Sequence, residues 1–268
     1  DLRIAFITPS VIGSEGQTRR TQPPLGIACI AALVREYGYK NIFIIDSSAE
    51  GYDNIEDVGD GFIRFGLDDK QVAQKVAEFK PNLVAISALF SSQAECAYSV
   101  AEAIRKMCKK AVIIMGGIHA SKAPKEVFNN CSSINYILSG EGDFSFVLLC
   151  DALSKGLDPS KEKVPGLVYK SKNQIIKFPE LPGLNVNELP FPAWDLMNMN
   201  LYWDIGMPHN PFMKSREYLT IMTERGCPEK CYFCSSSSYF GGNGVFKAMT
   251  PENVFCLLYT SPSPRDDR

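Results

Sequence analysis

The stretch Ala111-Val112-Ile113-Ile114-Met115-Gly116-Gly117-Ile118-His119-Ala120-Ser121 decides the fold of this chain. It is a short apolar run followed at once by two glycines and then by small and polar residues. Such a run predicts a strand that is buried on both faces of a sheet. The glycines allow the backbone after the strand to approach a ligand closely. The same arrangement, a buried strand followed by a small-residue loop, recurs along the first half of the chain.

Short apolar runs alternate with amphipathic helical patterns up to residue 153. Strands are predicted at Leu2–Thr8, Asn41–Asp46, Leu83–Ser87, Ala111–Met115 and Tyr136–Leu138. Helices are predicted at Leu25–Tyr37, Asp69–Phe79, Ala94–Cys108, Lys122–Phe128 and Phe144–Leu153. This alternation indicates an α/β fold, a doubly wound, flavodoxin-like (Rossmann-like) parallel sheet over residues 1–153. Ligands of such sheets bind beyond the carboxyl ends of the strands.

The loops at those ends are rich in glycine, serine and proline. Candidate ligand-contacting residues in them are Pro24, Leu25, Gly26, Ser87, Ser91, Gly116, Gly117, His119, Gly140, Glu141 and Gly142. Together these loops predict a floor for a large flat ligand, and His119 is expected to be a hydrogen-bonding residue of its loop. No G-x-G-x-x-G fingerprint follows the first strand, which disfavours a dinucleotide. The Asp/Gly-rich stretch Glu50–Gly66 is expected to be a solvated connection.

The pattern loosens after residue 153. Val164–Tyr169 and Gln174–Phe178 predict a small hairpin, and the prolines that follow predict a semi-rigid linker, so that residues 154–216 join two domains. The run Tyr218–Met222 predicts a further strand that opens a third segment, residues 217–255.

Three cysteines of this third segment, Cys227, Cys231 and Cys234, have the spacing C-x3-C-x2-C. Thiolates are soft ligands that suit iron–sulfur clusters or zinc. Structural zinc normally has four protein ligands, and no fourth candidate lies nearby in the sequence. The spacing therefore favours a [4Fe-4S] cluster with one iron left open. A zinc knuckle and three incidental cysteines are the alternatives.

The cysteine loop resembles the radical S-adenosylmethionine (SAM) signature C-x3-C-x-aromatic-C, with Phe233 as the aromatic residue. Thr223-Glu224-Arg225-Gly226 is similar to the T-x-R-G lead-in of the cobalamin-dependent branch of that superfamily. The resemblance implies that the open iron binds SAM, that Phe233 lies near its adenine, and that the cluster cleaves SAM to a 5′-deoxyadenosyl radical.

The loops of the first domain also resemble this branch. Pro23–Gly26 stands as P-P-L-G, Gly116–Ser121 as G-G-x-H-A-S and Gly140–Gly142 as G-E-G, elements similar to those of a cobalamin (B12)-binding domain. The chain departs from cobalamin proteins that ligate cobalt through the histidine of D-x-H-x-x-G, because Asp46-Ser47-Ser48 lacks that histidine. The resemblance therefore assigns no lower ligand to the cobalt.

The resemblance implies a cobalamin-dependent radical SAM enzyme that transfers a methyl group to an unactivated carbon. A cyclisation or another rearrangement, and a non-catalytic corrinoid carrier or sensor, are alternatives. It further implies a small-molecule substrate and an electron donor such as flavodoxin or ferredoxin. Residues 217–255 would be the start of a partial (β/α) barrel. Because most SAM and substrate contacts of such a barrel come from later strands, we expect this chain by itself to be inactive.

Composition and the end of the sequence complete these expectations. A net charge of −2 gives no reason to expect nucleic acid or an anionic membrane as partner. No apolar run reaches transmembrane length, and the cytoplasm is the expected compartment. Residues 256–268 resemble the translation of a transposase sequencing adapter, and we expect them to be a non-native tail that interrupts the helix begun at Thr250. A genuine Ser/Pro-rich tail is the alternative.

Overall fold

A computed structural model describes residues 2–181, 185–209, 215–229, 231–234, 236–239 and 245–260. The main sheet has the strand order β10-β9-β8-β7-β6-β1-β3. Its parallel strands are β1 (Arg3–Thr8), β3 (Asn41–Asp46), β6 (Leu83–Ser87), β7 (Val112–Gly116) and β8 (Tyr136–Leu138). In chain order the parallel strands are arranged 2-1-3-4-5, which is the flavodoxin-like order. The predicted doubly wound α/β fold is confirmed.

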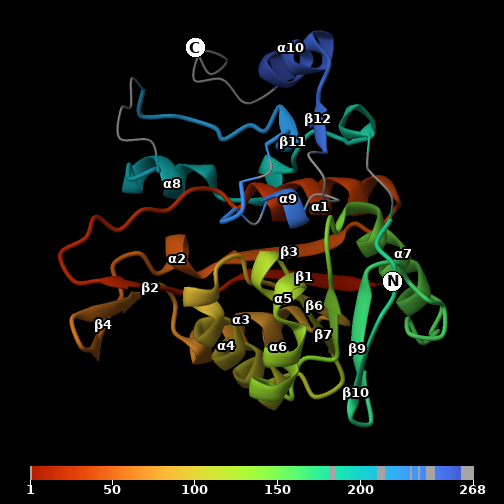
Figure 1. The fold of residues 1–268 in the computed structure, drawn as a ribbon. Coiled ribbons are helices and arrows are strands. Elements are labelled where there is room, and N and C mark those ends of the chain that lie inside the picture. Colours follow the sequence, from red (N-terminus) through yellow and green to blue (C-terminus); the bar gives the residue numbers. More distant parts are fainter. Residues whose placement is uncertain are drawn as a thin grey trace.

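Helices cover both faces of this sheet (Figure 1). On one face lie α1 (Leu25–Glu36) and α7 (Asp143–Ser154). On the other lie α3 (Asp69–Phe79), α4 (Ala94–Met107) and α6 (Pro124–Asn130). Shorter helical segments at the strand ends are α2 (Ser47–Glu50), η1 (Ser91–Gln93) and α5 (Ile118–Lys122).

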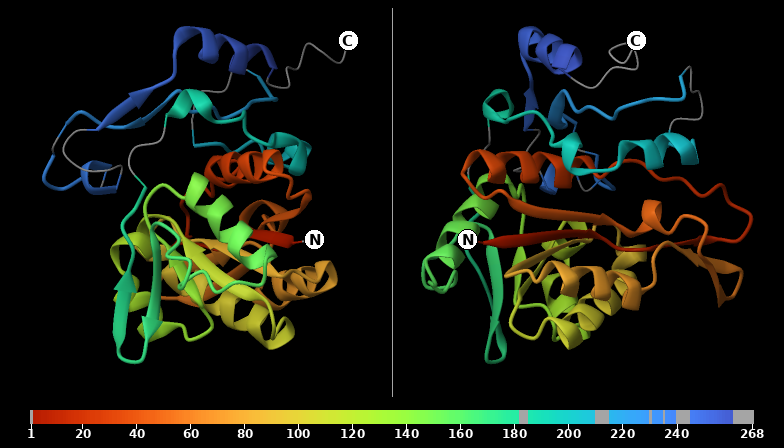
Figure 2. Two further views of the ribbon diagram at one scale, coloured as in Figure 1. Left: turned by 90° about the vertical axis from the view of Figure 1, so that its right-hand side faces the viewer. Right: turned by 180° about the vertical axis from the view of Figure 1, so that it is seen from behind.

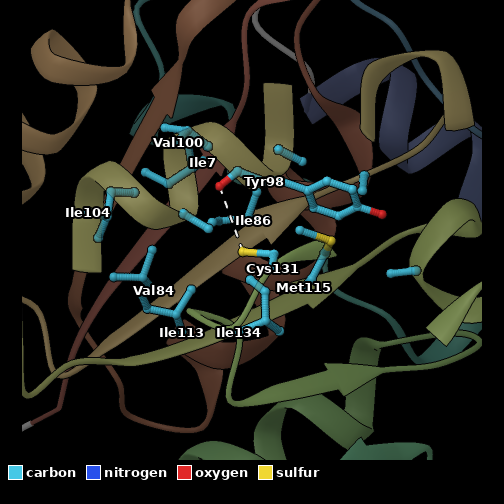
Figure 3. Close-up of a cluster of buried hydrophobic side chains, with 14 of the residues drawn as sticks. Ile7, Val84, Ile86, Tyr98, Val100, Ile104, Ile113, Met115, Cys131 and Ile134 are labelled. Carbon is cyan, nitrogen blue, oxygen red and sulfur yellow. Dashed lines mark hydrogen bonds between the residues drawn. The ribbon is translucent and has the colours of Figure 1, made fainter. Parts of the chain in front are cut away.

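The core is divided by the sheet because successive side chains of a strand point to opposite faces. In β1, Ile4 and Phe6 join the cluster under α1 and α7, whereas Ala5 and Ile7 join the cluster under α3 and α4. Figure 3 shows part of the second cluster, in which Cys131 Sγ lies 3.7 Å from the carbonyl oxygen of Tyr98. Strands buried on both faces explain the nearly continuous apolar runs of the sequence.

The predicted hairpin forms and also extends the main sheet. Its strands are β9 (Leu167–Ser171) and β10 (Gln174–Lys177), and β9 pairs antiparallel with β8. This pairing could not be predicted from the sequence, because only the first residues of β9, Leu167 and Val168, are buried. The hairpin therefore belongs to the same sheet as the strands that precede it.

The stretch Glu50–Gly66 is not simply a solvated connection, and that expectation is wrong for its second half. The strand β5 (Phe62–Phe65) pairs antiparallel with both β2 (Val11–Ser14) and β4 (Ile55–Gly59) in a small three-stranded sheet. Arg64 of β5 forms an ion pair with Asp69 and donates a 2.6 Å hydrogen bond to Ser10 Oγ. β4 is exposed along its whole length, so it lacks the apolar alternation that would have revealed it.

The C-terminal part crosses over the α1 side of the sheet (Figures 1 and 2). Its elements are η2 (Val186–Glu188), η3 (Trp194–Leu196), α8 (Met199–Ile205), β11 (Glu224–Gly226), α9 (Ser236–Tyr239), β12 (Phe246–Ala248) and α10 (Pro251–Thr260). The prediction of a strand at Tyr218–Met222 is wrong. The strand begins at Glu224 instead, because β12 pairs antiparallel with Glu224–Gly226. The opening of a partial (β/α) barrel stays a prediction.

Helix α10 continues through residues 256–260, so the expected interruption of this helix near Phe255 is also wrong. The residues Cys256–Thr260 extend its helical pattern, and Leu257 is buried. The origin of residues 256–268 stays a prediction, and residues 261–268 lie outside the described part. Across the described residues, no helix is both long and apolar enough to span a membrane.

Asp68 caps α3 and provides a direct test of the fold. Its side chain accepts a 2.7 Å hydrogen bond from the Gln71 backbone N–H, and Gln71 Oε1 accepts a 2.9 Å bond from the Asp68 N–H. We expect Asp68→Ala to lower the free energy of unfolding by about 1 kcal/mol, because these N–H groups lose their partners. Urea unfolding followed by circular dichroism measures the change. Lys70→Ala, in the same turn, is the control and should stay within about 0.5 kcal/mol of the wild type; equal losses in the two variants would contradict the capping role.

Candidate functional site

A cavity of about 510 Å³ lies at the carboxyl ends of the parallel strands. Its floor is built by Thr8, Ala85, Ser87, Ile114, Gly116 and Leu138, from the ends of β1, β6, β7 and β8. Parallel strands joined by crossover helices end at one edge of the sheet, so these residues come together although they are far apart in sequence. This is the place where the sequence predicts a ligand.

The other walls come from α1 and from segments that cross the opening. Apolar side chains, including Phe6, Ile30 and Phe146, line its inner part. Arg20, Thr21, Gln22 and His209 lie on the cavity wall, where Arg20 also donates a 2.6 Å hydrogen bond to the Pro208 carbonyl. Leu89 and Phe90 line the cavity as well, and their side chains are 52% and 65% exposed. The cavity therefore offers broad apolar surface with polar groups among it.

The residues proposed from the sequence divide into two groups. On the cavity wall are Pro24, Leu25, Gly26, Ser87, Gly116, Gly117, Gly140 and Gly142. Off the wall are Ser91, His119 and Glu141. Gly117 has φ +98° and a Cβ there would lie 2.4 Å from the Ala88 carbonyl oxygen, so glycine is required for the backbone to turn at this point.

His119 lies behind the cavity wall, in α5. Its side chain is 2% exposed, its Nε2 lies 2.8 Å from the Tyr98 hydroxyl, and its Nδ1 lies 3.0 Å from Ser91 Oγ. Both ring nitrogens are therefore engaged within the protein. His119 and Ser91 support the loop that carries Gly116 and Gly117 instead of facing a ligand.

A buried carboxyl, that of Asp46, lines the cavity at the end of β3. It accepts hydrogen bonds from the Tyr202 hydroxyl at 2.9 Å and from the Ser48 hydroxyl at 2.8 Å. Burial raises the pKa of Asp46 to about 6, although the bonds from Ser48 and Tyr202 act in the opposite direction. Ser48 in turn lies 3.0 Å from the Thr21 hydroxyl. This network ties the strand end to α8 and to the segment across the opening.

Residues Ser139–Asp143, here called the 139–143 loop, run from the end of β8 to the first residue of α7 and connect the cavity to the C-terminal part. Gly140 and Gly142 line the cavity, and the Tyr239 hydroxyl donates a 2.9 Å hydrogen bond to the Gly140 carbonyl. Arg225 of β11 binds Asp143 through two hydrogen bonds, of 2.6 and 3.1 Å. Burial alone would lower the pKa of Arg225, but the hydrogen bonds and charge of Asp143 outweigh it and keep the pKa above its usual value.

The three motif cysteines follow Arg225 closely in sequence. Cys231 is exposed, and Cys227 and Cys234 are half-buried. Hydrogen bonds from Ser236 lower the pKa of Cys234. Phe233 is 80% exposed. In the described part of the chain, no three His, Cys, Asp or Glu side chains converge on a single metal position.

Comparison with known proteins identifies the class to which this fold and cavity belong. Residues 17–149 match the model of the B12 binding domain family. This range contains most of the cavity floor and the loops from Pro24 to Gly142 that line it. The first part of the chain is therefore a B12-binding domain, as the resemblance of its loops predicted.

The relatives extend this likeness beyond the B12-binding domain. The chain is 28% identical over 263 residues to the cytidylyl-2-hydroxyethylphosphonate methyltransferase of Streptomyces wedmorensis, covering 89% of this chain and 48% of the relative. It is 34% identical over 222 residues to an uncharacterized methyltransferase of Pyrococcus horikoshii, covering 82% of this chain and 42% of the relative. The fold is similar to that of the cobalamin-dependent SAM radical enzyme OxsB with aqua-cobalamin and SAM bound, with a TM-score of 0.72 at 17% identity over 97% of this chain and 31% of OxsB.

The chain thus resembles cobalamin-binding radical SAM proteins over most of its length, as predicted. It spans less than half the length of the curated relatives it matches.

The described residues fit both implied cofactors by their chemistry. A corrin is a broad, largely apolar ring with amide arms, and the cavity offers apolar side chains together with glycine backbone and hydroxyl groups. At Gly26 an added Cβ would have no neighbour within 4 Å, so space is kept open beside the wall. For the cluster, the three cysteine thiols supply the soft donor set that iron–sulfur clusters use, although the described side chains do not converge on one metal position.

Several residues of the site were not found from the sequence. Arg20, Thr21, Asp46, Phe146, His209 and Tyr239 all line the cavity. His209 and Tyr239 reach it from segments more than sixty residues beyond its nearest loop, so no local pattern could reveal them. Asp46 could have been found, because it ends a predicted strand on the same edge as the other loops.

Asp46 makes the stability of the chain depend on pH. Its pKa rises from the usual 3.8 to about 6 on folding, so the folded chain holds this proton more strongly than the unfolded chain. The free energy of unfolding should therefore fall as the pH rises from about 4 to about 6, by up to about 3 kcal/mol from this group. Asp46→Asn should remove that part of the decline, as measured by thermal unfolding at a series of pH values. The exposed Asp53→Asn variant is the control; the same decline in Asp46→Asn as in the wild type would disprove the role.

Proposed function

We propose that this chain is the cobalamin-binding part and the cluster-binding segment of a radical SAM enzyme that transfers a methyl group to an unactivated carbon. When bound, the [4Fe-4S] cluster, SAM and cobalamin supply the reductive cleavage of SAM and the transfer of the methyl group. The observation that carries the proposal is the contact between the two sites: Arg225, two residues before Cys227, binds Asp143, the neighbour of the cavity residue Gly142.

The residues have separable roles in this proposal. Gly26, Gly116 and Gly142 leave room for the corrinoid along the cavity, and Phe6 and Phe146 provide apolar surface for it. Cys227, Cys231 and Cys234 would ligate three irons of the cluster, leaving the fourth for SAM. Phe233, which is largely exposed, would cover the adenine of SAM. Both of the relatives described above are named as methyltransferases, which favours methyl transfer.

The cluster assignment is tested by anaerobic reconstitution with iron and sulfide. The wild-type chain should hold about four irons, and the variant carrying Cys227→Ala, Cys231→Ala and Cys234→Ala should hold almost none, because it lacks the thiolates. Metal analysis and electronic spectra provide the measurement. Cys256→Ala removes an exposed thiol outside the motif and should retain the iron. Zinc in place of iron in the wild type would support the zinc-knuckle alternative and end the proposal.

The corrinoid site is tested by filling it. Gly26→Leu adds a side chain at a point of the cavity wall where the free chain has open space. We expect the dissociation constant for hydroxocobalamin to rise about tenfold or more, which corresponds to about 1.4 kcal/mol, while the melting temperature of the free chain changes little. Equilibrium dialysis with visible absorbance measures the binding.

Gly13→Ala, a glycine of β2 that also has open space but does not line the cavity, is the control for this experiment. Unchanged hydroxocobalamin binding by Gly26→Leu, or no binding by the wild type, would place the corrinoid elsewhere.

Methyl transfer and cyclisation are separated by isotope labelling. The assay uses the longer enzyme of which this chain is proposed to be a part, supplied with a chemical reductant and with SAM whose methyl group is deuterated. Methyl transfer predicts label in the corrinoid fraction by mass spectrometry, whereas cyclisation needs only the adenosyl radical and leaves the corrinoid unlabelled. A carrier or sensor would bind the corrinoid without cleaving SAM. The proposal also includes a small-molecule substrate, a flavodoxin- or ferredoxin-like electron donor, no nucleic-acid partner and a cytoplasmic setting.

A further inference from the structure

The 139–143 loop receives polar contacts from three C-terminal elements, α9, β11 and β12. Tyr239 of α9 binds the Gly140 carbonyl at 2.9 Å. Lys247 of β12 binds Glu141 at 2.6 Å, and Arg225 of β11 binds Asp143 at 2.6 Å. No other cavity loop in the described part is shown to form an ion pair with β11 or β12. The loop is thus the main polar link between the B12-binding domain and the cysteine segment.

The two ion pairs form one unit. Arg225 and Lys247 are directly opposite each other in the β11–β12 pairing, and Glu141 and Asp143 are two residues apart in the loop. The side chains of Arg225 and Asp143 are 8% and 5% exposed, and those of Lys247 and Glu141 are 14% and 16% exposed. Charges removed from water this far are tolerated only when each meets its partner with good geometry. The β11–β12 hairpin therefore has one favourable position against the loop.

Each end of this unit is connected closely to one of the proposed cofactor sites. On the loop side, Gly140 and Gly142 alternate with Glu141 and Asp143 and line the cavity. On the hairpin side, Gly226 has φ +91° and leaves no room for a Cβ beside the Val245 carbonyl. The next residue, Cys227, donates a 3.1 Å backbone hydrogen bond to that same carbonyl. A shift of the loop therefore moves the hairpin, and with it the first motif cysteine.

We propose that the Arg225–Asp143 and Lys247–Glu141 pairs couple the two cofactor sites, so that loading the cysteine loop with its cluster strengthens corrinoid binding and the reverse. The inference rests on the proposed function. In this proposal, cluster binding favours the position of the hairpin in which both ion pairs are formed. The hairpin in that position holds the 139–143 loop in the conformation that binds the corrinoid. Such coupling is reciprocal by thermodynamic necessity. Two pairs that only held the fold together would leave the affinity of each site independent of the other.

The experiment compares hydroxocobalamin affinity in the full chain with and without its reconstituted iron–sulfur cluster, under anaerobic conditions. In the wild type we expect the loaded chain to bind at least about fivefold more tightly. In Asp143→Asn, which keeps the shape of the side chain and removes its charge, the two affinities should agree within about twofold. Lys247→Met provides a second variant, also with reduced coupling, in case Asp143→Asn does not fold.

Asp151→Asn is the matched control, because Asp151 lies on α7 like Asp143, and the change removes an exposed carboxylate that pairs with Lys155, the residue after that helix. It should keep the wild-type ratio. The measured quantity is a ratio of affinities, so a variant that merely lowers stability does not change it. A wild-type ratio near one, or a wild-type ratio preserved in Asp143→Asn and Lys247→Met, overturns the coupling while leaving the proposed function intact. Failure of the wild type to bind iron or corrinoid refutes the proposed function, and the coupling with it.

Discussion

The parallel arrangement of β3, β1, β6, β7 and β8 is the constraint on which the rest of this molecule depends. Parallel strands require a crossover after each strand, and these crossovers return the chain across a face of the sheet. All five strands therefore end at one edge, and the loops that follow them share that edge. The cavity exists because Gly116, Gly140 and Ser87 are brought together there by topology and not by any local preference.

The buried parts of this arrangement could be predicted from the sequence because burial on both faces leaves a local record. The apolar runs and the Asp68 cap were sufficient to find the parallel strands and the long helices within a few residues. The exposed elements left no such record. β4 has no buried residue, and β9 joins the sheet edge through a pairing whose partner lies about thirty residues earlier. The strand expected at Tyr218–Met222 does not form, because strand pairing here depends on where β12 meets the chain, which is at Glu224–Gly226.

The same distinction applies to the candidate site. Loop glycines could be predicted because a buried strand followed by glycine is a local pattern, and several of them do line the cavity. Which side chains face the cavity is a property of three dimensions. The hydrogen bonds expected of His119 do form, with Tyr98 and Ser91, but they hold its ring behind the cavity wall. Asp46 is the opposite case. It was not predicted as a site residue, and only the absence of a histidine after it was used, yet its own buried carboxyl faces the cavity.

A buried ion pair is a costly way to join two parts of a chain, because hydrophobic residues of similar volume often stabilise a protein as well or better. Its advantage is directional. Apolar surfaces at the α1 side would allow the β11–β12 hairpin to slide, whereas a two-bond contact between Arg225 and Asp143 fixes both position and orientation. Under the proposed function, the chain holds a metal cluster at a set place relative to a corrin ring and needs that precision more than it needs stability. The location of the charges, between a cavity loop and the residues before Cys227, is the location where such precision has its greatest effect.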